Sequence, residues 1–422
     1  MIGREKPLSS TRENEAPMAF VHLHNHTEYS LLDGMTHVKD MVRRAADFNM
    51  PAVAITDHGV MSGVPELCEA CEAVEKETGK KVKPIYGCEV YFTIDDTLAR
   101  DGKPKLYHLL LLAKTNEGYH NLLKLVSESH VDNYYYKPRT TFAQLQKYGK
   151  GIIGTSACIA GIIPNLLDSR QFDDACAWAR KFASCFEPGD FYIELQNQGP
   201  EVKTDGGMTQ VELNRLLVKV AQECGLKTIA TNDFHYLNRE DARSHDILLC
   251  IGTGSKIDDA KRMRFPNDQF YMKSEAEMRE ALAEFPEACD NTVEVAEKCN
   301  VELERDSILP RFPLPEGETE ESWFRKKCEM GLVGRYLPAE QKQAIAFDPN
   351  NRDTVLTGIE KLRELRSDVM ERYETEAEVI LNAGFPAYFL IVQEYIEWAR
   401  SQGIGVGPGR GSAAGAIVAY AM

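Results

Sequence analysis

The chain has 422 residues, enough for two domains or for one large domain with an extension. Its hydrophobic content of 43% predicts a sizeable core, and no stretch approaches the ~20 consecutive apolar residues of a membrane helix. The formal net charge of −16 argues against tight binding of nucleic acid, which depends on clustered Lys and Arg. Local basic exceptions occur at residues 137–139 and 261–264. Eleven cysteines without a paired framework predict reduced thiols and a cytoplasmic location.

Short apolar runs alternate with longer amphipathic ones between residues 21 and 232. Strands are predicted at 21–26, 52–56, 84–91, 106–113, 151–154, 191–195 and 228–232. Helices are predicted at 38–48, 66–78, 119–130, 172–185 and 210–224. This alternation predicts an α/β fold with a parallel sheet. Seven strands suggest a barrel with one strand fewer than the common eight-stranded form, and an open doubly wound sheet is the alternative.

The pattern becomes helical from about residue 240. Helices are predicted at 240–250, 274–284, 287–299, 353–383 and 388–401. The proline-rich stretch 306–317 is the best candidate for a domain linker. The first 17 residues are polar throughout, which excludes a visible signal peptide and predicts a disordered extension.

Side chains that bind metals recur near the ends of the predicted strands. His24 and His26 are two residues apart in the first strand, so their side chains leave the same face. Because parallel barrels place their active sites at the carboxyl ends of strands, such residues should converge on one rim. The candidate metal-binding and catalytic residues are His24, His26, Asp33, His58, Glu89, His108, Cys158, Asp233 and His235.

These nine side chains are too many for a single ion, because one zinc takes four ligands. Two or three divalent ions with shared carboxylates fit better. The single cysteine favours Zn, and the imidazole and carboxylate mixture also suits Mn or Fe. Such a centre activates water at neutral pH, so the reaction class is metal-assisted phosphoester hydrolysis. Asp57 is expected to orient a ligand rather than to bind metal itself.

Two segments, residues 22–34 (HLHNHTEYSLLDG) and 55–59 (ITDHG), resemble the polymerase and histidinol phosphatase (PHP) domain. The version here is similar to the one that opens the α subunits of bacterial DNA polymerase III, the C-family replicative polymerases. Residues 107–114, 135–139 and 231–236 support this resemblance, and 384–392 and 407–415 resemble the start of the polymerase palm. The resemblance covers residues 18–422. It implies a distorted seven-stranded (β/α) barrel over 18–285, followed by a mostly helical linker and palm segment over 286–422.

All nine candidate residues match metal-binding positions of that family. The resemblance therefore implies a 3′–5′ exonuclease that proofreads the 3′ end of a DNA primer–template. A scaffold domain that keeps its metals without catalysis, and a stand-alone PHP phosphatase, are the alternatives. The motifs favour the replicative enzyme but leave an error-prone paralogue open.

The glycine-rich end of the chain resembles a triphosphate-binding loop. By resemblance, the residues that contact an incoming deoxynucleotide are Gly409, Arg410, Gly411 and Ser412. No acidic pair follows Ser412, whereas the family's polymerase aspartates come after this segment. The sequence is therefore expected to be an N-terminal fragment that does not extend a primer. The sliding clamp and other replisome subunits are expected to bind regions outside it.

Overall fold

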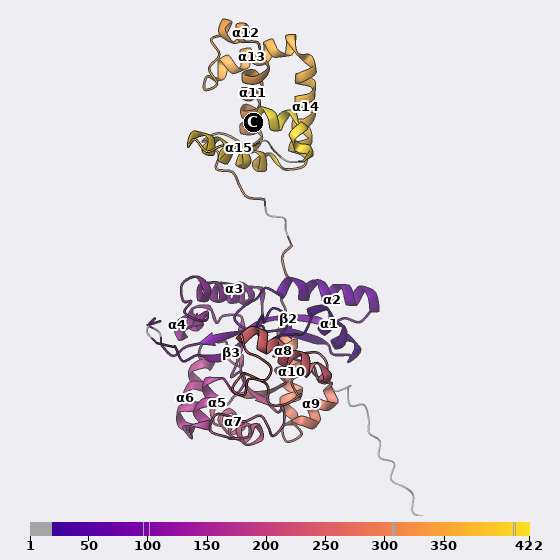
Figure 1. Cartoon of the computed structure of the whole chain (residues 1–422), viewed down its shortest axis with the longest axis vertical. Helices are drawn as coiled ribbons and strands as arrows, with labels where there is room; N and C mark the ends of the chain where they lie inside the picture. The colour runs from indigo at the N-terminus through magenta and orange to yellow at the C-terminus, as the bar shows by residue number, and fades with distance from the viewer. Residues whose placement is uncertain (1–18, 96, 101, 306–308, 408, 410) are drawn as a thin grey trace, which may run out of the picture. The chain divides into compact units, whose positions relative to one another are not determined.

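The computed structural model describes residues 19–422 except 96, 101, 306–308, 408 and 410 (Figure 1). The chain divides into two compact units, one up to Leu303 and one from Glu304. The extension expected over residues 1–17 lies outside the described residues. The first unit continues past residue 285, where the sequence analysis places the end of the barrel domain, because α10 (Pro286–Lys298) packs closely against β7 (Lys227–Thr231).

The first unit is a mixed α/β structure around a curled seven-stranded sheet, which confirms the predicted fold class. Its strands run in the order β1-β2-β3-β5-β6-β7, with the two-residue β4 (Arg139–Thr140) paired to β2. The other strands are β1 (Ala52–Ile55), β2 (Lys83–Phe92), β3 (Tyr107–Ala113), β5 (Ile152–Thr155) and β6 (Phe191–Gln196), with β7 as given above.

The prediction of a regular first strand over residues 21–26 is wrong, because the first regular strand is β1. This segment is extended but irregular, and Asn25 explains why. Its side-chain amide donates to the carbonyls of His22 and Ala54 at 3.1 and 2.9 Å, so a side chain replaces part of the backbone ladder. The segment still bonds to both edges of the sheet, through Ala54 N to His22 O and His26 N to Phe234 O. It therefore joins β1 to the chain that follows β7.

The prediction of a fully parallel sheet is also wrong, because β3 runs antiparallel to both β2 and β5. The other pairings are parallel. The described residues between β2 and β3 form no helix, whereas a parallel connection normally needs a helical crossover. Reversal of β3 brings its amino end to the rim where the neighbouring strands have their carboxyl ends.

Helices cover the sheet of the first unit (Figure 1). They are α1 (Val38–Asp47), α2 (Val64–Thr78), α3 (Asn116–Val131), α4 (Phe142–Tyr148), α5 (Ile162–Asp168), α6 (Phe172–Ala183), α7 (Gln210–Cys224), η1 (Arg239–Asp241), α8 (Ala242–Thr253) and α9 (Glu275–Ala281), followed by α10. Local sequence fixes several of these starts. For example, Thr209 and Glu212 form a capping box that begins α7.

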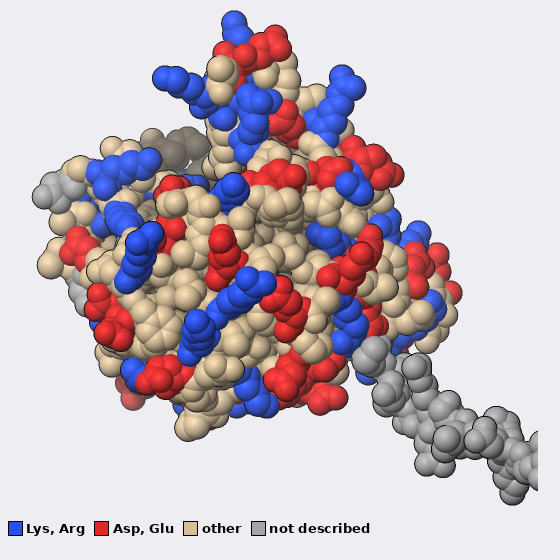
Figure 2. Space-filling view, turned by 90° about the horizontal axis from the view of Figure 1, so that it is seen from below, with Lys and Arg blue, Asp and Glu red and all other residues tan. Residues whose placement is uncertain are grey.

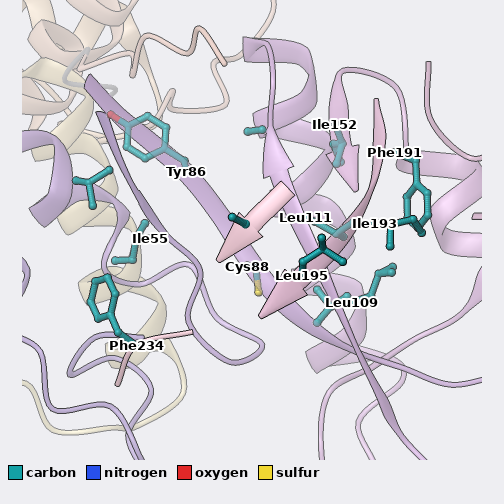
Figure 3. Close-up of a cluster of buried hydrophobic side chains, with 14 of the residues drawn as sticks. Ile55, Tyr86, Cys88, Leu109, Leu111, Ile152, Phe191, Ile193, Leu195 and Phe234 are labelled. Atoms are coloured by element: carbon teal, nitrogen blue, oxygen red, sulfur yellow. The ribbon is translucent and has the colours of Figure 1, made fainter. Parts of the chain in front are cut away.

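Apolar side chains from both faces of the strands form the core. Leu109 and Leu111 alternate with Leu110 and Leu112 along β3, and all four are buried. Figure 3 shows Cys88, Leu109, Leu111 and Leu195 among the strands of this cluster. A strand buried on both faces reads as a continuous apolar run, which is why residues 109–112 are all leucine. All eleven cysteines are free thiols, in agreement with the sequence analysis.

The second unit is helical. It contains α11 (Glu320–Tyr336), α12 (Ala339–Ala344), α13 (Arg352–Leu365), α14 (Ser367–Asn382), α15 (Pro386–Ser401), η2 (Ser412–Gly415) and α16 (Ile417–Ala421). The single helix predicted over 353–383 is wrong, because the chain breaks at Arg366 (φ −143°, ψ 61°). The break lets α13 pack on α11 while α14 packs on α16.

The described residues show how charge is distributed over the surface and whether any helix could span a membrane. Figure 2 shows Lys and Arg interspersed with Asp and Glu over the visible face. Among the described helices, none is by itself long and apolar enough for a membrane span; only the bent pair α14 and α15, at 111°, meets the criterion jointly.

Candidate metal centre

The structure brings all nine predicted residues to one rim of the sheet. Shortly after parallel strands, as the sequence analysis expects, come His58, Cys158, Asp233 and His235, and Glu89 lies near the carboxyl end of β2. His108 is the second residue of β3, and the reversed direction of that strand places it at the same rim. His24 and His26 come from the irregular segment that joins β1 to the chain after β7, and Asp33 follows in the next turn.

Glu89 lies at the centre of the cluster and is 1% exposed. Its Oε1 lies 3.1 Å from His24 Nε2 and 3.0 Å from His108 Nδ1. Its Oε2 lies 2.8 Å from His58 Nδ1 and 3.5 Å from His26 Nε2. One carboxylate thus faces four imidazoles, an arrangement suited to a carboxylate that bridges two ions.

Cys158 completes this side of the cluster. Its sulfur lies 3.8 Å from Glu89 Oε1 and 3.6 Å from His108 Nδ1. Burial raises the pKa of the Cys158 thiol well above its usual value, and the carboxylate of Glu89 adds to the shift. The thiol is therefore protonated at neutral pH unless a bound cation favours the thiolate.

A second carboxylate serves the other side. Asp233 Oδ1 lies 3.1 Å from His26 Nε2 and 3.4 Å from His24 Nε2. The ring centroid of His235 is 4.3 Å from that of His26. Asp233 has a positive φ of 49°, a costly conformation that lets the chain turn and present both residues after β7.

Asp33 extends the cluster beyond His58, since Asp33 Oδ2 lies 3.3 Å from His58 Nε2. The Asp33 carbonyl lies 2.7 Å from His245 Nε2 on α8, a contact that fixes the turn. Side chains of Asp33, His58 and His108 are the more exposed ones, at 14%, 14% and 23%. They mark the side of the centre that is open to solvent.

The residues fit divalent cations. Several of their donor atoms are buried, lie close together and have no hydrogen-bond partner outside the cluster: His24 Nε2, His26 Nε2, Asp33 Oδ1, His58 Nδ1, Glu89 Oε2 and Asp233 Oδ1. Buried polar atoms without partners are costly, so their convergence calls for a cation between them. Three groups have donor atoms within 4.8 Å of one another: His26, His58 and His235; His24, His26 and Glu89; and His58, Glu89 and His108.

The protonation states follow from burial and from the carboxylates. Burial lowers the pKa of His58, but hydrogen bonds to Asp33 and Glu89 outweigh it and raise the value to about 10. Burial also disfavours the charged form of His24, yet Asp233, Glu194 and Glu89 raise its pKa well above normal. Burial lowers the pKa of His235 to about 3, and His26 contributes further. Without cations, the centre therefore holds some of its rings charged beside the carboxylates.

Glu194 is a buried residue of the site that the sequence analysis missed. It lies on β6 and its Oε1 is 2.6 Å from His24 Nδ1. It also accepts hydrogen bonds from Thr155, Thr231 and Gln196 at 2.6, 2.5 and 2.8 Å. The sequence does hold a signal for this residue, a lone glutamate within the apolar strand 191–196. A carboxylate buried in a strand needs several hydrogen-bond partners, so its presence indicates a polar site.

Asp57 orients a ligand, as the sequence analysis expects. It accepts hydrogen bonds from Thr27 N, Thr27 Oγ1 and Ser30 Oγ at 2.7, 2.8 and 2.7 Å. Ser30 Oγ in turn lies 3.0 Å from His26 Nδ1. Because the hydroxyl donates to Asp57, it accepts from His26 Nδ1–H and leaves the lone pair of Nε2 directed at the cluster.

The residues expected to bind a nucleotide triphosphate belong to the second unit, whereas this centre is built by the first. Arg410 is outside the described residues, as is the side chain of Ser412. Gly409 is exposed, and Gly411 has a φ of 78°, a conformation that favours glycine. Triphosphate binding by this segment stays a prediction.

Comparisons with known proteins identify both units. Residues 22–198 match the family model of the PHP domain, and residues 322–422 match that of the bacterial DNA polymerase III alpha NTPase domain. DNA polymerase III subunit alpha of Borreliella burgdorferi is 39% identical over 409 residues, 96% of this chain and 32% of that protein. The Thermus aquaticus protein of the same name is 38% identical over 448 residues, 96% of this chain and 35% of that protein.

One solved structure, a candidate metal-dependent phosphoesterase from Bifidobacterium adolescentis, is 16% identical. It covers 52% of this chain and 89% of its own, with a TM-score of 0.30, too low to inform function. The family-model match over residues 22–198 shows that the site-bearing unit is a PHP domain. The chain belongs to the family of bacterial DNA polymerase III α subunits, and it spans about a third of the length of the curated relatives that it matches.

Proposed function

We propose that the PHP domain of this chain is a metal-dependent 3′–5′ exonuclease that removes mispaired nucleotides from the 3′ end of a DNA primer–template. The observation that supports it is the meeting of nine donor side chains in one cluster, in which six of the residues hold a buried donor atom without a hydrogen-bond partner outside the cluster. Such a set suits two or three divalent ions, with Zn favoured by Cys158 and with Mn or Fe as alternatives. When bound, the ions neutralise phosphate charge and lower the pKa of water.

The protein contributes fixed geometry and defined tautomers. The Nδ1 atoms of His24, His26 and His235 lie 2.6, 3.0 and 2.8 Å from oxygens of Glu194, Ser30 and Asp233 respectively. An N–H at Nδ1 leaves a lone pair on Nε2, the form in which imidazole binds a cation. Glu89 and Asp233 bring negative charge that balances the cations. Burial of the cluster excludes bulk water and strengthens these interactions.

The test is cleavage of a 3′-mismatched primer–template in Zn²⁺ or Mn²⁺, beside the double variant Asp233→Asn, His235→Asn. Release of 3′ nucleotides by the parent chain and its loss in the variant are the expected result. Metal content is measured on both proteins. A parent chain that holds metal and cleaves neither DNA nor a small phosphodiester would reject the proposal.

A scaffold role is the second candidate, and the burial of the cluster favours it. Glu89 is 1% exposed and both His24 and His26 are fully buried, so cations there would also tie four separate segments together. A catalytic role predicts loss of cleavage in the double variant. A scaffold role predicts only a lower melting temperature.

The roles of the second unit are proposed from family membership. We propose that residues 409–412 contact the triphosphate of an incoming deoxynucleotide and that the whole protein works with the sliding clamp and other replisome subunits in the cytoplasm. Glycines there let backbone N–H groups approach phosphate, and Arg410 supplies charge.

A further inference from the structure

A tyrosine-rich turn lies between α3 and β4, at residues 134–138. Tyr135 N donates to Lys137 O at 3.1 Å, which closes a tight turn with Tyr136 at its tip. Tyr136 has a φ of 61° and is 63% exposed, and Tyr134 is 50% exposed. A bulky residue in the left-handed region is uncommon and costs free energy, so the turn presents Tyr136 to solvent at an energetic cost.

Arg139 holds this turn in place. Its guanidinium is buried, and it donates to the carbonyls of Asn133, Leu98 and Ala99 at 2.9 Å each. It also lies 5.4 Å from the ring of Tyr135. Within the local basic segment 137–139, Arg139 is therefore not available to a ligand, because its donors bond backbone carbonyls. Lys137 keeps the charge that a ligand can reach.

The turn adjoins the metal centre. Lys137 Nζ lies 3.2 Å from the hydroxyl of Tyr91 and 5.0 Å from its ring centroid. The Tyr91 ring is 6.0 Å from that of His58 and 5.5 Å from that of His108, the two rings on the exposed side. A second tie runs through His130, whose Nε2 is 2.8 Å from the carbonyl of Gly59, next to His58.

The His130 ring stacks on that of Tyr134, with centroids 6.3 Å apart. Tyr134, Tyr136 and Lys137 are thus fixed relative to the donors Asp33, His58 and His108. The turn therefore borders the exposed side of the centre.

We propose that Tyr134, Tyr136 and Lys137 form a platform for the unpaired 3′-terminal nucleotides of a DNA strand, with tyrosine rings under bases and the Lys137 ammonium near a phosphate. This inference rests on the proposed exonuclease function and names the form of its substrate. An exposed aromatic face with a neighbouring cation matches the alternation of base and phosphate in a single strand. A base pair inside a duplex has both faces covered by its neighbours and a terminal pair has only its outer face free, so a frayed end is the form that can stack several bases on the platform.

The platform gives a physical route to mismatch selectivity. A mispaired terminal base costs less to unstack than a paired one, so it reaches the tyrosines more often. Binding that depends on a few stacked bases and on one lysine also agrees with the net charge of −16, which does not favour a long basic groove.

The primary test measures binding without catalysis. A 3′-fluorescein oligothymidylate is titrated with the full chain in EDTA, and affinity is followed by fluorescence anisotropy. Tyr136→Asn removes the ring and keeps a residue that tolerates the left-handed conformation, whereas Tyr136→Phe keeps the ring. We expect Tyr136→Asn to weaken binding at least about fivefold and Tyr136→Phe to bind like the parent. Lys137→Met should lower the slope of log affinity against log salt by about 0.7, the value for one phosphate.

Lys147→Met is the matched control. Lys147 also lies over a tyrosine, with Nζ 4.5 Å from the Tyr148 ring centroid, but it contacts Glu128 and Tyr148 rather than a residue beside the metal centre. It should leave both affinity and salt slope unchanged. Unchanged affinity in Tyr136→Asn together with an unchanged slope in Lys137→Met would overturn the platform.

Kinetics separate this inference from the proposed function. With metal added, Tyr136→Asn should raise KM for a 3′-mismatched primer and leave hydrolysis of bis(p-nitrophenyl) phosphate unchanged, because the small diester needs the metal centre alone. Cleavage of neither substrate by the parent would reject the exonuclease. The EDTA binding comparison would then still decide whether the turn binds a single strand.

Discussion

Replacement of Glu194 by glutamine tests how the site is built. The carboxylate of Glu194 accepts from four donors: His24 Nδ1, the hydroxyls of Thr155 and Thr231, and the amide of Gln196. In Glu194→Gln, one side-chain oxygen becomes an NH₂ group, which cannot accept. Because Oε1 accepts three of these bonds and Oε2 accepts one, at least one of the four donors, the Thr155 hydroxyl, loses its acceptor inside the protein.

Two magnitudes follow from that loss. Each buried donor without a partner costs about 1–3 kcal/mol, so the free energy of unfolding without metal should fall by at least about 1 kcal/mol. At roughly 2 °C per kcal/mol for a unit of this size, the melting temperature in EDTA should fall by at least about 2 °C. In addition, His24 loses the negative charge that supports it as a ligand. Loss of such an orienting partner typically weakens metal binding about 10- to 100-fold.

The assays are thermal unfolding in EDTA and titration of the metal-free chain with Zn²⁺. Glu187→Gln is a matched control, because Glu187 accepts a bond from Lys114 at 2.9 Å and its side chain is 47% exposed. We expect the control to behave like the parent. A Glu194→Gln protein with unchanged melting temperature and unchanged zinc affinity would refute the reasoning. A lower melting temperature with parental affinity would leave Glu194 a purely structural residue.

Three further predictions concern the fold and its cations. Zinc at 100 times its dissociation constant should stabilise the parent by about 2.7 kcal/mol. If calorimetric scans with and without zinc coincide, the prediction that this cluster binds metal is contradicted. Burial lowers the pKa of Lys273 to about 8, below its unfolded value, so the unfolded state binds more protons between pH 8 and 10.5. The free energy of unfolding of the parent, relative to Lys273→Met, should therefore rise with pH across that window by about 3 kcal/mol, measured by urea denaturation at several pH values. On α11, Gly331→Ala should destabilise the second unit, because the added Cβ would lie 1.9 Å from the carbonyl oxygen of Ala421. In Gly334→Ala the added Cβ meets only the Phe347 ring, at 4.0 Å, so this variant should be neutral or stabilising by up to about 1 kcal/mol. Equal melting temperatures of the two glycine variants would contradict this packing.

Local chemistry in the sequence determined most of the site. The two-residue spacing of His24 and His26, and polar residues directly after apolar runs at His58 and Asp233, are local signals. They arise because strand ends at one rim of a sheet hold side chains that face solvent and one another. The same locality applies to helix starts, where a capping box such as that of Thr209 and Glu212 is complete within four residues.

Only the tertiary structure decided how those residues meet. The direction of β3 depends on which neighbours it pairs with, and this pairing carries His108 to the rim. The irregular path of residues 21–26 depends on Asn25, whose acceptor on Ala54 is 29 positions away. Burial of Arg139 and the role of Glu194 rest on similar long-range contacts. Residue types along the chain specify which groups can bind cations, but pairing between distant segments sets their directions, burial and hydrogen bonds.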